Sequence, residues 1–187
     1  RPLFLEQMLK NGSDVNYADR NGNTLLMYAS GYEPQKYGFL PGKGNYSSAD
    51  YAKLFLRYDA DVSQQNKEGW PALDYAVQLD DDMAAMNLLL SYGAEVTPVV
   101  LSHALDFEGA YTHYQRIHKL VALLDSSQTS TILTPIFDAA IRGDNATVQE
   151  LATKTDLSEA ERLQTLCHAV AFCNADTVRL LLADGFG

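Results

Sequence analysis

The chain has 187 residues, 47% of them hydrophobic, which is enough apolar surface for one cooperative domain or one short repeat array. Its net charge is −10, with fourteen basic against twenty-four acidic residues and no basic half or tail. This charge excludes nucleic acid and anionic membranes as expected partners, because both attract clusters of Lys and Arg. No apolar run is long enough to span a bilayer, so membrane insertion is not expected.

Short amphipathic segments in the first half predict helices. The expected helices cover residues 3–10, 25–31, 49–58, 71–79 and 83–92. The first of them ends at Asn11-Gly12, which is a helix-stop signal. Asp19-Arg20-Asn21-Gly22 predicts a tight turn, because an Asn-Gly pair tolerates positive φ. Thr24 then supplies the side chain expected to cap the following helix.

The chain repeats itself at an offset of 47 residues. Residues 14–29 read DVNYADRNGNTLLMYA, and residues 61–76 read DVSQQNKEGWPALDYA. Val96 then follows Val62 by 34 residues, in a Gly-Ala-Glu-Val segment. A period of about 33 residues predicts a stack of supersecondary units, each too small to bury its apolar face alone.

These repeats resemble ankyrin repeats, whose pattern opens Asp-x-x-Gly-x-Thr-Pro-Leu-His-x-Ala and closes Leu-Leu-x-x-Gly-Ala-Asp-Val-Asn. The matching residues are Asp19, Gly22, Thr24, Leu26 and Ala29 in one repeat, and Gly69, Leu73, Ala76, Leu88, Leu89, Gly93, Ala94 and Val96 in the next. The resemblance implies an all-α solenoid of stacked helix-turn-helix pairs with short finger loops, in about five to six repeats. The first repeat retains only its outer helix.

The second half resembles the same family more loosely. Its expected helices cover residues 98–105, 111–125, 137–144, 147–152, 168–176 and 177–184. The Asp-x-x-Gly opening is absent from Thr97 onward, which predicts repeats without protruding fingers. We therefore expect one ankyrin-repeat domain over residues 1–187, with clear repeats over 1–97 and degenerate ones over 98–187.

An insertion interrupts the clear repeats. The interval of 47 residues exceeds an ordinary repeat by about 14 residues, which lie within residues 31–48. Tyr37, Phe39 and Tyr46 stand there among Gly and Pro residues. Tyrosine on a loop suits recognition, so these residues are predicted partner contacts. The alternative, which stays open, is that the aromatic residues fold back over a neighbouring helix pair.

The resemblance also implies which other residues contact a partner. They are Arg20, Asn21, Asn23, Gln65, Lys67 and Glu68 on the fingers, and Met27, Asp74 and Gln78 on the inner helices. Met27 and Asp74 stand where the family has histidine, which implies a lost local hydrogen bond and a more adaptable groove. Trp70, the only tryptophan, is expected either to anchor a partner or to pack against the neighbouring finger.

No motif for catalysis or for binding a metal or cofactor is visible, so none of these is expected. The dipole of a helix start explains the acidic run at residues 80–82, and a calcium loop would alternate its carboxylates around a glycine. His113 and His118 are five residues apart, which does not align them as a zinc pair. Cys167 and Cys173 match no C-x-x-C pattern and are expected to be reduced, mostly buried thiols, in keeping with a cytoplasmic protein.

The sequence therefore predicts a non-catalytic protein–protein interaction module that binds its partner through the concave face of fingers and inner helices. The acidity favours a basic protein partner, and a monomer is expected outside the complex. The irregular repeat lengths resemble bacterial ankyrin proteins, which suggests an immunity or antitoxin protein or an adaptor. The alternative is a targeting scaffold segment of a larger enzyme or a host-directed effector, which the uncapped apolar first helix favours.

Overall fold

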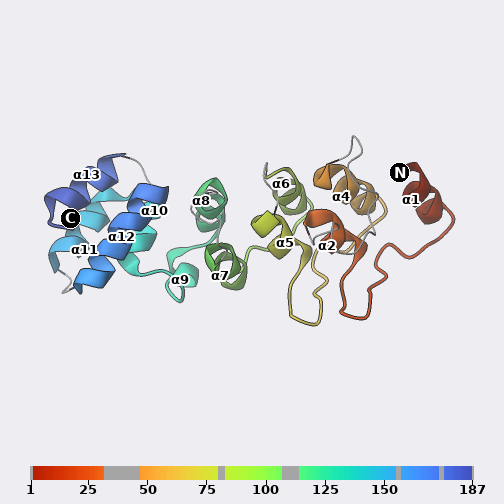
Figure 1. Ribbon diagram of the computed structural model, residues 1–187, viewed down its shortest axis with the longest axis horizontal. Coiled ribbons are helices and arrows are strands. Elements are labelled where there is room, and N and C mark those ends of the chain that lie inside the picture. Colours follow the sequence, from red (N-terminus) through yellow and green to blue (C-terminus); the bar gives the residue numbers. More distant parts are fainter. Residues whose placement is uncertain are drawn as a thin grey trace. The chain divides into compact units, whose positions relative to one another are not determined.

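The computed structural model describes residues 2–31, 47–79, 83–106, 114–154, 157–172 and 175–186. Within these ranges helices joined by turns make up the chain, which divides into two compact units, Arg1–Glu95 and Val96–Gly187 (Figure 1). We call them unit 1 and unit 2. The division lies two residues before the boundary predicted between the clear and the degenerate repeats.

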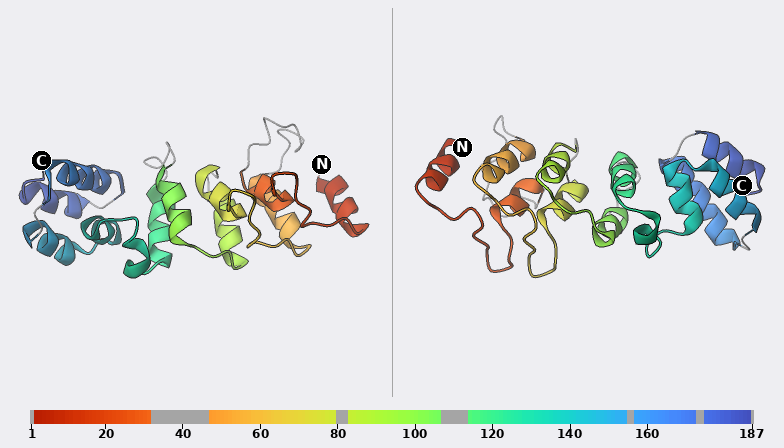
Figure 2. Two further views of the ribbon diagram at one scale, coloured as in Figure 1. Left: turned by 90° about the horizontal axis from the view of Figure 1, so that it is seen from below. Right: turned by 180° about the vertical axis from the view of Figure 1, so that it is seen from behind.

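Unit 1 consists of two stacked helix pairs preceded by a single helix. Its helices are α1 (Pro2–Lys10), α2 (Leu25–Ser30), α4 (Ser48–Leu56), α5 (Ala72–Leu79) and α6 (Ala84–Ser91). Helix α2 packs against α4 and α5, while α4 packs against α1 and α6. Therefore α2 and α5 form one layer, and α1, α4 and α6 form the other (Figures 1 and 2). The predicted helices of this unit are confirmed to within two residues at each end.

Local capping and apolar packing explain these helices. The Thr24 side chain accepts a hydrogen bond from the backbone N–H of Met27, 3.3 Å away, which confirms the predicted cap of α2. Ser47 and Asp50 cap α4 reciprocally, each side chain bonding the other's backbone N–H. The fully buried side chains between the two layers include Leu26, Met27, Phe55, Leu73, Met86 and Leu89.

Unit 2 has helix pairs of the same kind. Its helices are α7 (Pro98–Asp106), α8 (Tyr114–Leu123), α9 (Ser126–Thr129), α10 (Pro135–Arg142), α11 (Asn145–Lys154), α12 (Glu159–Phe172) and α13 (Ala175–Ala183). Helix α10 packs against α8, α11 and α12, and α13 packs against α11 and α12. Their shared core is made of Ile136, Ala139, Ala140, Val148, Ala152, Ala169, Leu181 and Phe186.

Two helices of unit 2 differ from the sequence prediction. The short helix α9 was not expected, and α12 begins at Glu159, although a helix was expected only from residue 168. Capping boxes are the reason in both cases. Asp125 and Gln128 satisfy each other's backbone N–H groups at the start of α9. Ser158 and Glu161 do the same at the start of α12.

Candidate functional site

Two loops of unit 1 project from the layer formed by α2 and α5, and they lie side by side in Figure 1 and in the right-hand view of Figure 2. We call residues 17–24 the first finger and residues 64–71 the second finger. Each finger is closed by an isolated β-bridge, between Ala18 and Thr24 in the first and between Gln65 and Pro71 in the second.

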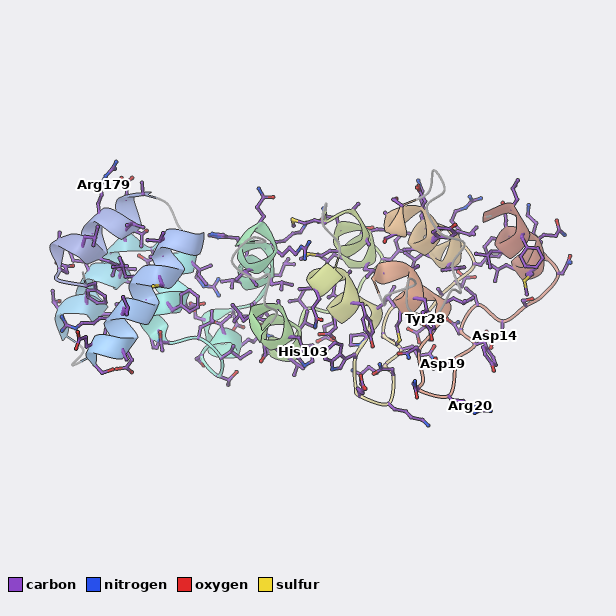
Figure 3. The ribbon with its side chains drawn as sticks, in the orientation of Figure 1. Asp14, Asp19, Arg20, Tyr28, His103 and Arg179 are labelled. Atoms are coloured by element: carbon purple, nitrogen blue, oxygen red, sulfur yellow. The ribbon has the colours of Figure 1, made fainter. Side chains whose placement is uncertain are left out.

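One carboxylate fixes the backbone of the first finger. Asp19 Oδ1 accepts hydrogen bonds from the backbone N–H groups of Asn21 (2.8 Å) and Asn23 (2.9 Å). Its Oδ2 accepts a hydrogen bond of 2.6 Å from the hydroxyl of Tyr28 in α2, and the two side chains lie close together in Figure 3. Asp19 therefore fixes the turn and also attaches the finger to its own helix.

Hydrogen bonding also stabilises the charge of Asp19. Burial by itself would raise the pKa of this carboxyl group. The hydrogen bonds from the Tyr28 hydroxyl and from the backbone of Asn23 and Asn21 outweigh burial and hold the pKa below its usual value. The base of the first finger is therefore anionic at neutral pH.

An amide fixes the second finger at the corresponding position, 47 residues further on. Asn66 Oδ1 accepts hydrogen bonds from the backbone N–H groups of Glu68 (3.0 Å) and Trp70 (2.9 Å). Asn66 Nδ2 donates to the hydroxyl of Tyr75 (2.8 Å) and to Oδ1 of Asn23 (2.9 Å). Because Asn23 belongs to the first finger, this buried amide joins the two fingers at their bases.

The backbones of the two fingers are also in direct contact. The backbone N–H of Lys67 donates a hydrogen bond of 2.9 Å to the carbonyl oxygen of Asn21. Gly22 has a φ of +84°, and a Cβ at this position would lie 3.0 Å from both Asn66 Cα and Lys67 N. Only glycine permits both the left-handed backbone and this close approach. The fingers therefore form one rigid double turn.

The surface of this double turn exposes five of the predicted contact residues. They are Arg20 and Asn21 on the first finger, and Gln65, Lys67 and Glu68 on the second. Figure 3 shows Arg20 at the end of its loop, directed away from the helices. Within the ranges that the structure describes, the side chains of Arg20 and Lys67 make no hydrogen bond or ion pair. We therefore expect these two cations to contribute little to the stability of unit 1.

Trp70 and Gln78 lie at the border of the exposed surface, and both are half-buried. The ring centroid of Trp70 is 5.5 Å from that of Tyr75, with the ring planes tilted by 50°. Trp70 thus packs against the inner helix of its own repeat. Trp70 remains partly exposed within the second finger.

Three predicted contact residues are buried and offer no surface to a partner. Asn23 is 2% exposed, Met27 0% and Asp74 1%. Met27 Sδ accepts a hydrogen bond from the backbone N–H of Thr24, 3.4 Å away. A local hydrogen bond is therefore present at this position, with sulfur as the acceptor, although the replacement of histidine was expected to remove one.

The predicted contacts in the insertion, Tyr37, Phe39 and Tyr46, lie outside the described residues. The same holds for the acidic run at residues 80–82 and for His113.

Sequence reasoning missed the residues that hold the fingers in place. Tyr28, Asn66 and Tyr75 were not among the predicted site residues, although all three bond to the finger turns or between them. A signal was present in the internal repeat. Asp19 precedes Tyr28 by nine residues, and Asn66 precedes Tyr75 by the same number.

Unit 2 contains a polar cluster of a different kind. Asp138 Oδ2 accepts a hydrogen bond from Arg142 Nε (2.9 Å), and Asp138 Oδ1 accepts one from the Thr129 hydroxyl (2.8 Å). Arg142 Nη2 donates to the carbonyl oxygen of Leu124, also at 2.9 Å. A crevice of about 270 Å³ lies beside this cluster. Because these polar groups bond one another, we interpret the cluster as the attachment of α9 and the end of α8 to α10.

Cys167 is exposed, so the expectation of a buried thiol is wrong at this position. The reason is that residues two apart on a helix point to nearly opposite faces, and Ala169 faces the core. Cys173 lies outside the described residues. Where side chains are placed, no three His, Cys, Asp or Glu residues are arranged to hold a metal ion. No helix in the same ranges has the length and apolar character needed to cross a membrane.

Neither a protein-family model nor a curated protein matches this sequence. Among solved structures, the human ASB11 ankyrin repeat domain is similar, with a TM-score of 0.56 and 21% identity over 99% of this chain and 79% of that one. A chain in the complex of the predatory endopeptidase Bd0816 from Bdellovibrio bacteriovorus with the immunity protein Bd3460 has 21% identity and a TM-score of 0.48, over 96% of this chain and 90% of that one. The stacked helix pairs, the two fingers and the similarity to the ASB11 domain together show that this chain has an ankyrin-repeat fold.

Proposed function

We propose that this chain is a non-catalytic protein-binding module whose contact surface is formed by the tips of the two fingers. The observation that carries the proposal is a fixed backbone that presents uncommitted side chains. The buried Asn66 amide and the bond from Lys67 N–H to the Asn21 carbonyl hold the tips in one arrangement. A surface that is ordered before binding loses little conformational entropy on association.

Burial narrows the contact surface that the sequence indicated. The residues retained in the proposal are Arg20, Asn21, Gln65, Lys67 and Glu68, with Trp70 and Gln78 at the border. Trp70 has the size and the partial exposure of an interface anchor, but it also contributes to the packing of α5. Arg20 and Lys67 are therefore the cleaner test of binding.

The net charge of the chain and the local charges at the fingertips each indicate a property of the partner, the first at long range and the second in direct contact. The net charge of −10 favours a basic protein, through attraction that raises the rate of encounter. Salt screens such attraction beyond about 8 Å at physiological ionic strength, so the groups in contact follow local charge instead. Arg20 and Lys67 favour carboxylates on the partner where it meets the fingertips.

Two finer roles fit this proposal. A preformed face on an acidic protein suits an inhibitor of a basic partner, as in a bacterial immunity or antitoxin protein, and it suits an adaptor equally. In the alternative role, the chain is a targeting segment of a larger enzyme or of a host-directed effector. The mass of the native protein tests the alternative, because a targeting segment of a larger enzyme requires further chain beyond these 187 residues.

The experiment that tests the proposal is affinity capture from native lysate with matched variants. We expect Arg20→Ala with Lys67→Ala to lose a partner that the wild-type chain retains. The control removes the same charge from the exposed outer surface of unit 1, as Lys53→Ala with Arg57→Ala, and should retain the partner.

The outcomes separate clearly. If only the variant with Arg20→Ala and Lys67→Ala fails to retain the partner, the proposed contact surface is supported. Mass spectrometry of the protein captured by the wild-type chain then identifies the partner. Equal retention by both variants would place the contact elsewhere on the chain. Equal loss in both would show that binding does not depend specifically on the fingertip cations.

A further inference from the structure

The two fingers differ in what contacts one side of each finger, which we call its edge. The edge is formed by Asn21 and Gly22 in the first finger and by Glu68 and Gly69 in the second. The Asn21 carbonyl of the first finger accepts a hydrogen bond from Lys67 N–H, and a Cβ at Gly22 would meet the backbone of Asn66 and Lys67. The equivalent residues of the second finger are Glu68 and Gly69, 47 positions further on. No backbone group of the described residues donates to the Glu68 carbonyl, and a Cβ at Gly69 would meet nothing within 4 Å.

The chain itself therefore shows what fits such an edge. On the first finger the occupant is the turn of the second finger, whose backbone lies 3.0 Å from the position that a Cβ on Gly22 would take. It supplies one backbone N–H to a carbonyl oxygen. The second finger keeps the same glycine, with a φ of +83°, and the same closing β-bridge around its own turn. An exposed edge of this kind is a template for pairing with another backbone.

We propose that an extended turn of a protein partner docks on this edge, in the place that a third finger would occupy. One backbone N–H of the partner donates to the carbonyl oxygen of Glu68, and the adjacent backbone passes over Gly69. This inference rests on the proposed function and adds a backbone contact to the side-chain contacts of the fingertips.

The expected occupant has a recognisable chemistry. In the first edge the occupying residues are Asn66 and Lys67, a turn-forming amide followed by a cation. At the second edge a cation in the equivalent place would lie near the exposed Glu68 carboxylate. We therefore expect a partner turn with Asn or Asp followed by Lys or Arg, which agrees with a basic partner.

The probe that tests this inference is a cyclic peptide with the sequence of residues 63–72, SQQNKEGWPA, because this segment fills the first edge. Titration into the ¹⁵N-labelled full chain should cause saturable shifts of the backbone amides of Glu68, Gly69 and Trp70. The amide of Gly22, whose edge is already filled, should not shift. The same peptide with the backbone nitrogen of its lysine methylated cannot donate the hydrogen bond and should bind about fivefold more weakly, as expected for one lost hydrogen bond.

A matched pair of variants tests the approach over Gly69. Gly69→Ala places a methyl group on the edge and should weaken the peptide by about fivefold or more. Gly12→Ala is the control, because Gly12 has a φ of +88° and a Cβ added there would also meet nothing within 4 Å. This variant therefore carries the same backbone strain at a place away from the edge. Peptide affinity should be unchanged in Gly12→Ala.

Three outcomes would overturn the inference. The first is the absence of saturable shifts at the second finger, and the second is equal binding of the methylated peptide. The third is concentration-dependent self-association of the chain that Gly69→Ala abolishes, which would assign the edge to a second copy. In each case capture of a partner through Arg20 and Lys67 would be unaffected, so failure here is distinguishable from failure of the proposed function.

Discussion

The two fingers share one backbone frame but use different chemistry to hold it. The first has a carboxylate at its base, Asp19, which accepts three hydrogen bonds. The second has an amide, Asn66, whose oxygen accepts two hydrogen bonds and whose nitrogen donates two. Because a carboxylate has no proton to donate at neutral pH, only the amide can also join the neighbouring finger through Asn23. In Asn66 the acceptor oxygen fixes the turn of the second finger, and the donor nitrogen joins the two fingers.

The glycines of the fingers make a second comparison. Gly22 and Gly69 have nearly the same φ, +84° and +83°. The space around them differs, because another backbone lies against Gly22 and none of the described backbone lies against Gly69. Gly22 is therefore required both by its positive φ and by the close approach of another backbone, whereas Gly69 is required by its positive φ alone.

Removing the amide should have the largest effect on this comparison. Asn66→Ala should lower the free energy of unfolding by about 4 kcal/mol, because it deletes four hydrogen bonds and leaves buried partners unsatisfied. Asn66→Asp is the sharper control. It keeps the acceptor oxygens, and Tyr75 can donate to it as Tyr28 donates to Asp19, so only the link to Asn23 is lost. Urea denaturation measures both variants. Equal losses would contradict the view that the amide has two separable roles.

The glycine comparison predicts the next largest effect. Gly22→Ala should cost about 3 kcal/mol, because the strain of positive φ adds to a clash with the backbone of the second finger. Gly69→Ala should cost about 1 kcal/mol, from strain alone. The same denaturation experiment compares the two proteins. A similar cost at both positions would mean that the fingers separate easily and do not form a rigid pair.

The sequence was sufficient for much of this fold. The 47-residue offset and the Asn-Gly, Thr and Gly signals predicted every described helix of unit 1, because caps and apolar spacing are local properties. In unit 2 the helix α9 and the early start of α12 were missed. Both begin with capping boxes, Asp125 with Gln128 and Ser158 with Glu161, which are visible in the sequence.

The candidate site was less predictable, for a physical reason. Asn23 was expected to face a partner, but it is 2% exposed because the second finger covers it. Whether a finger residue is exposed depends on how closely two fingers stack, and stacking is set by contacts between residues more than 40 positions apart. Arg20 and Lys67, which the sequence predicts as partner contacts, are exposed, since fully burying an unpaired cation is costly.

The charge at the base of the first finger predicts a smaller, pH-dependent effect. The pKa of Asp19 lies below its usual value of 3.8, so the ionised form stabilises the folded state. This contribution is complete above the pKa of the unfolded state and is lost as the pH falls through the lower pKa of the folded state. Asp19→Asn should therefore remove part of the decline in stability below about pH 4. It should change stability little at pH 7, because Asn66 shows that an amide holds the same turn.

Denaturation of the two proteins between about pH 2 and pH 7 measures this effect, in the range where carboxyl groups titrate. Other carboxyl groups with lowered pKa, such as Asp61 and Asp144, are present in both proteins and cancel in the difference. The difference should be modest, because Asp19 is partly exposed and solvent screens its interactions. If the free energies of unfolding of the two proteins changed in parallel with pH, ionisation of Asp19 would not contribute to the stability of the folded state.

The smallest effect on stability is expected at the fingertips, and its size distinguishes a contact residue from a structural one. Arg20→Ala and Lys67→Ala should each change the free energy of unfolding by less than about 0.5 kcal/mol, since neither side chain is bonded to another described group. Substitution of Asn66, which is next to Lys67 in the sequence, should instead lower stability strongly. If either substitution lowered stability substantially, loss of partner binding in that variant would be explained by a deformed finger instead of a lost contact. A neutral effect on stability combined with a lost partner would assign these two residues to recognition alone.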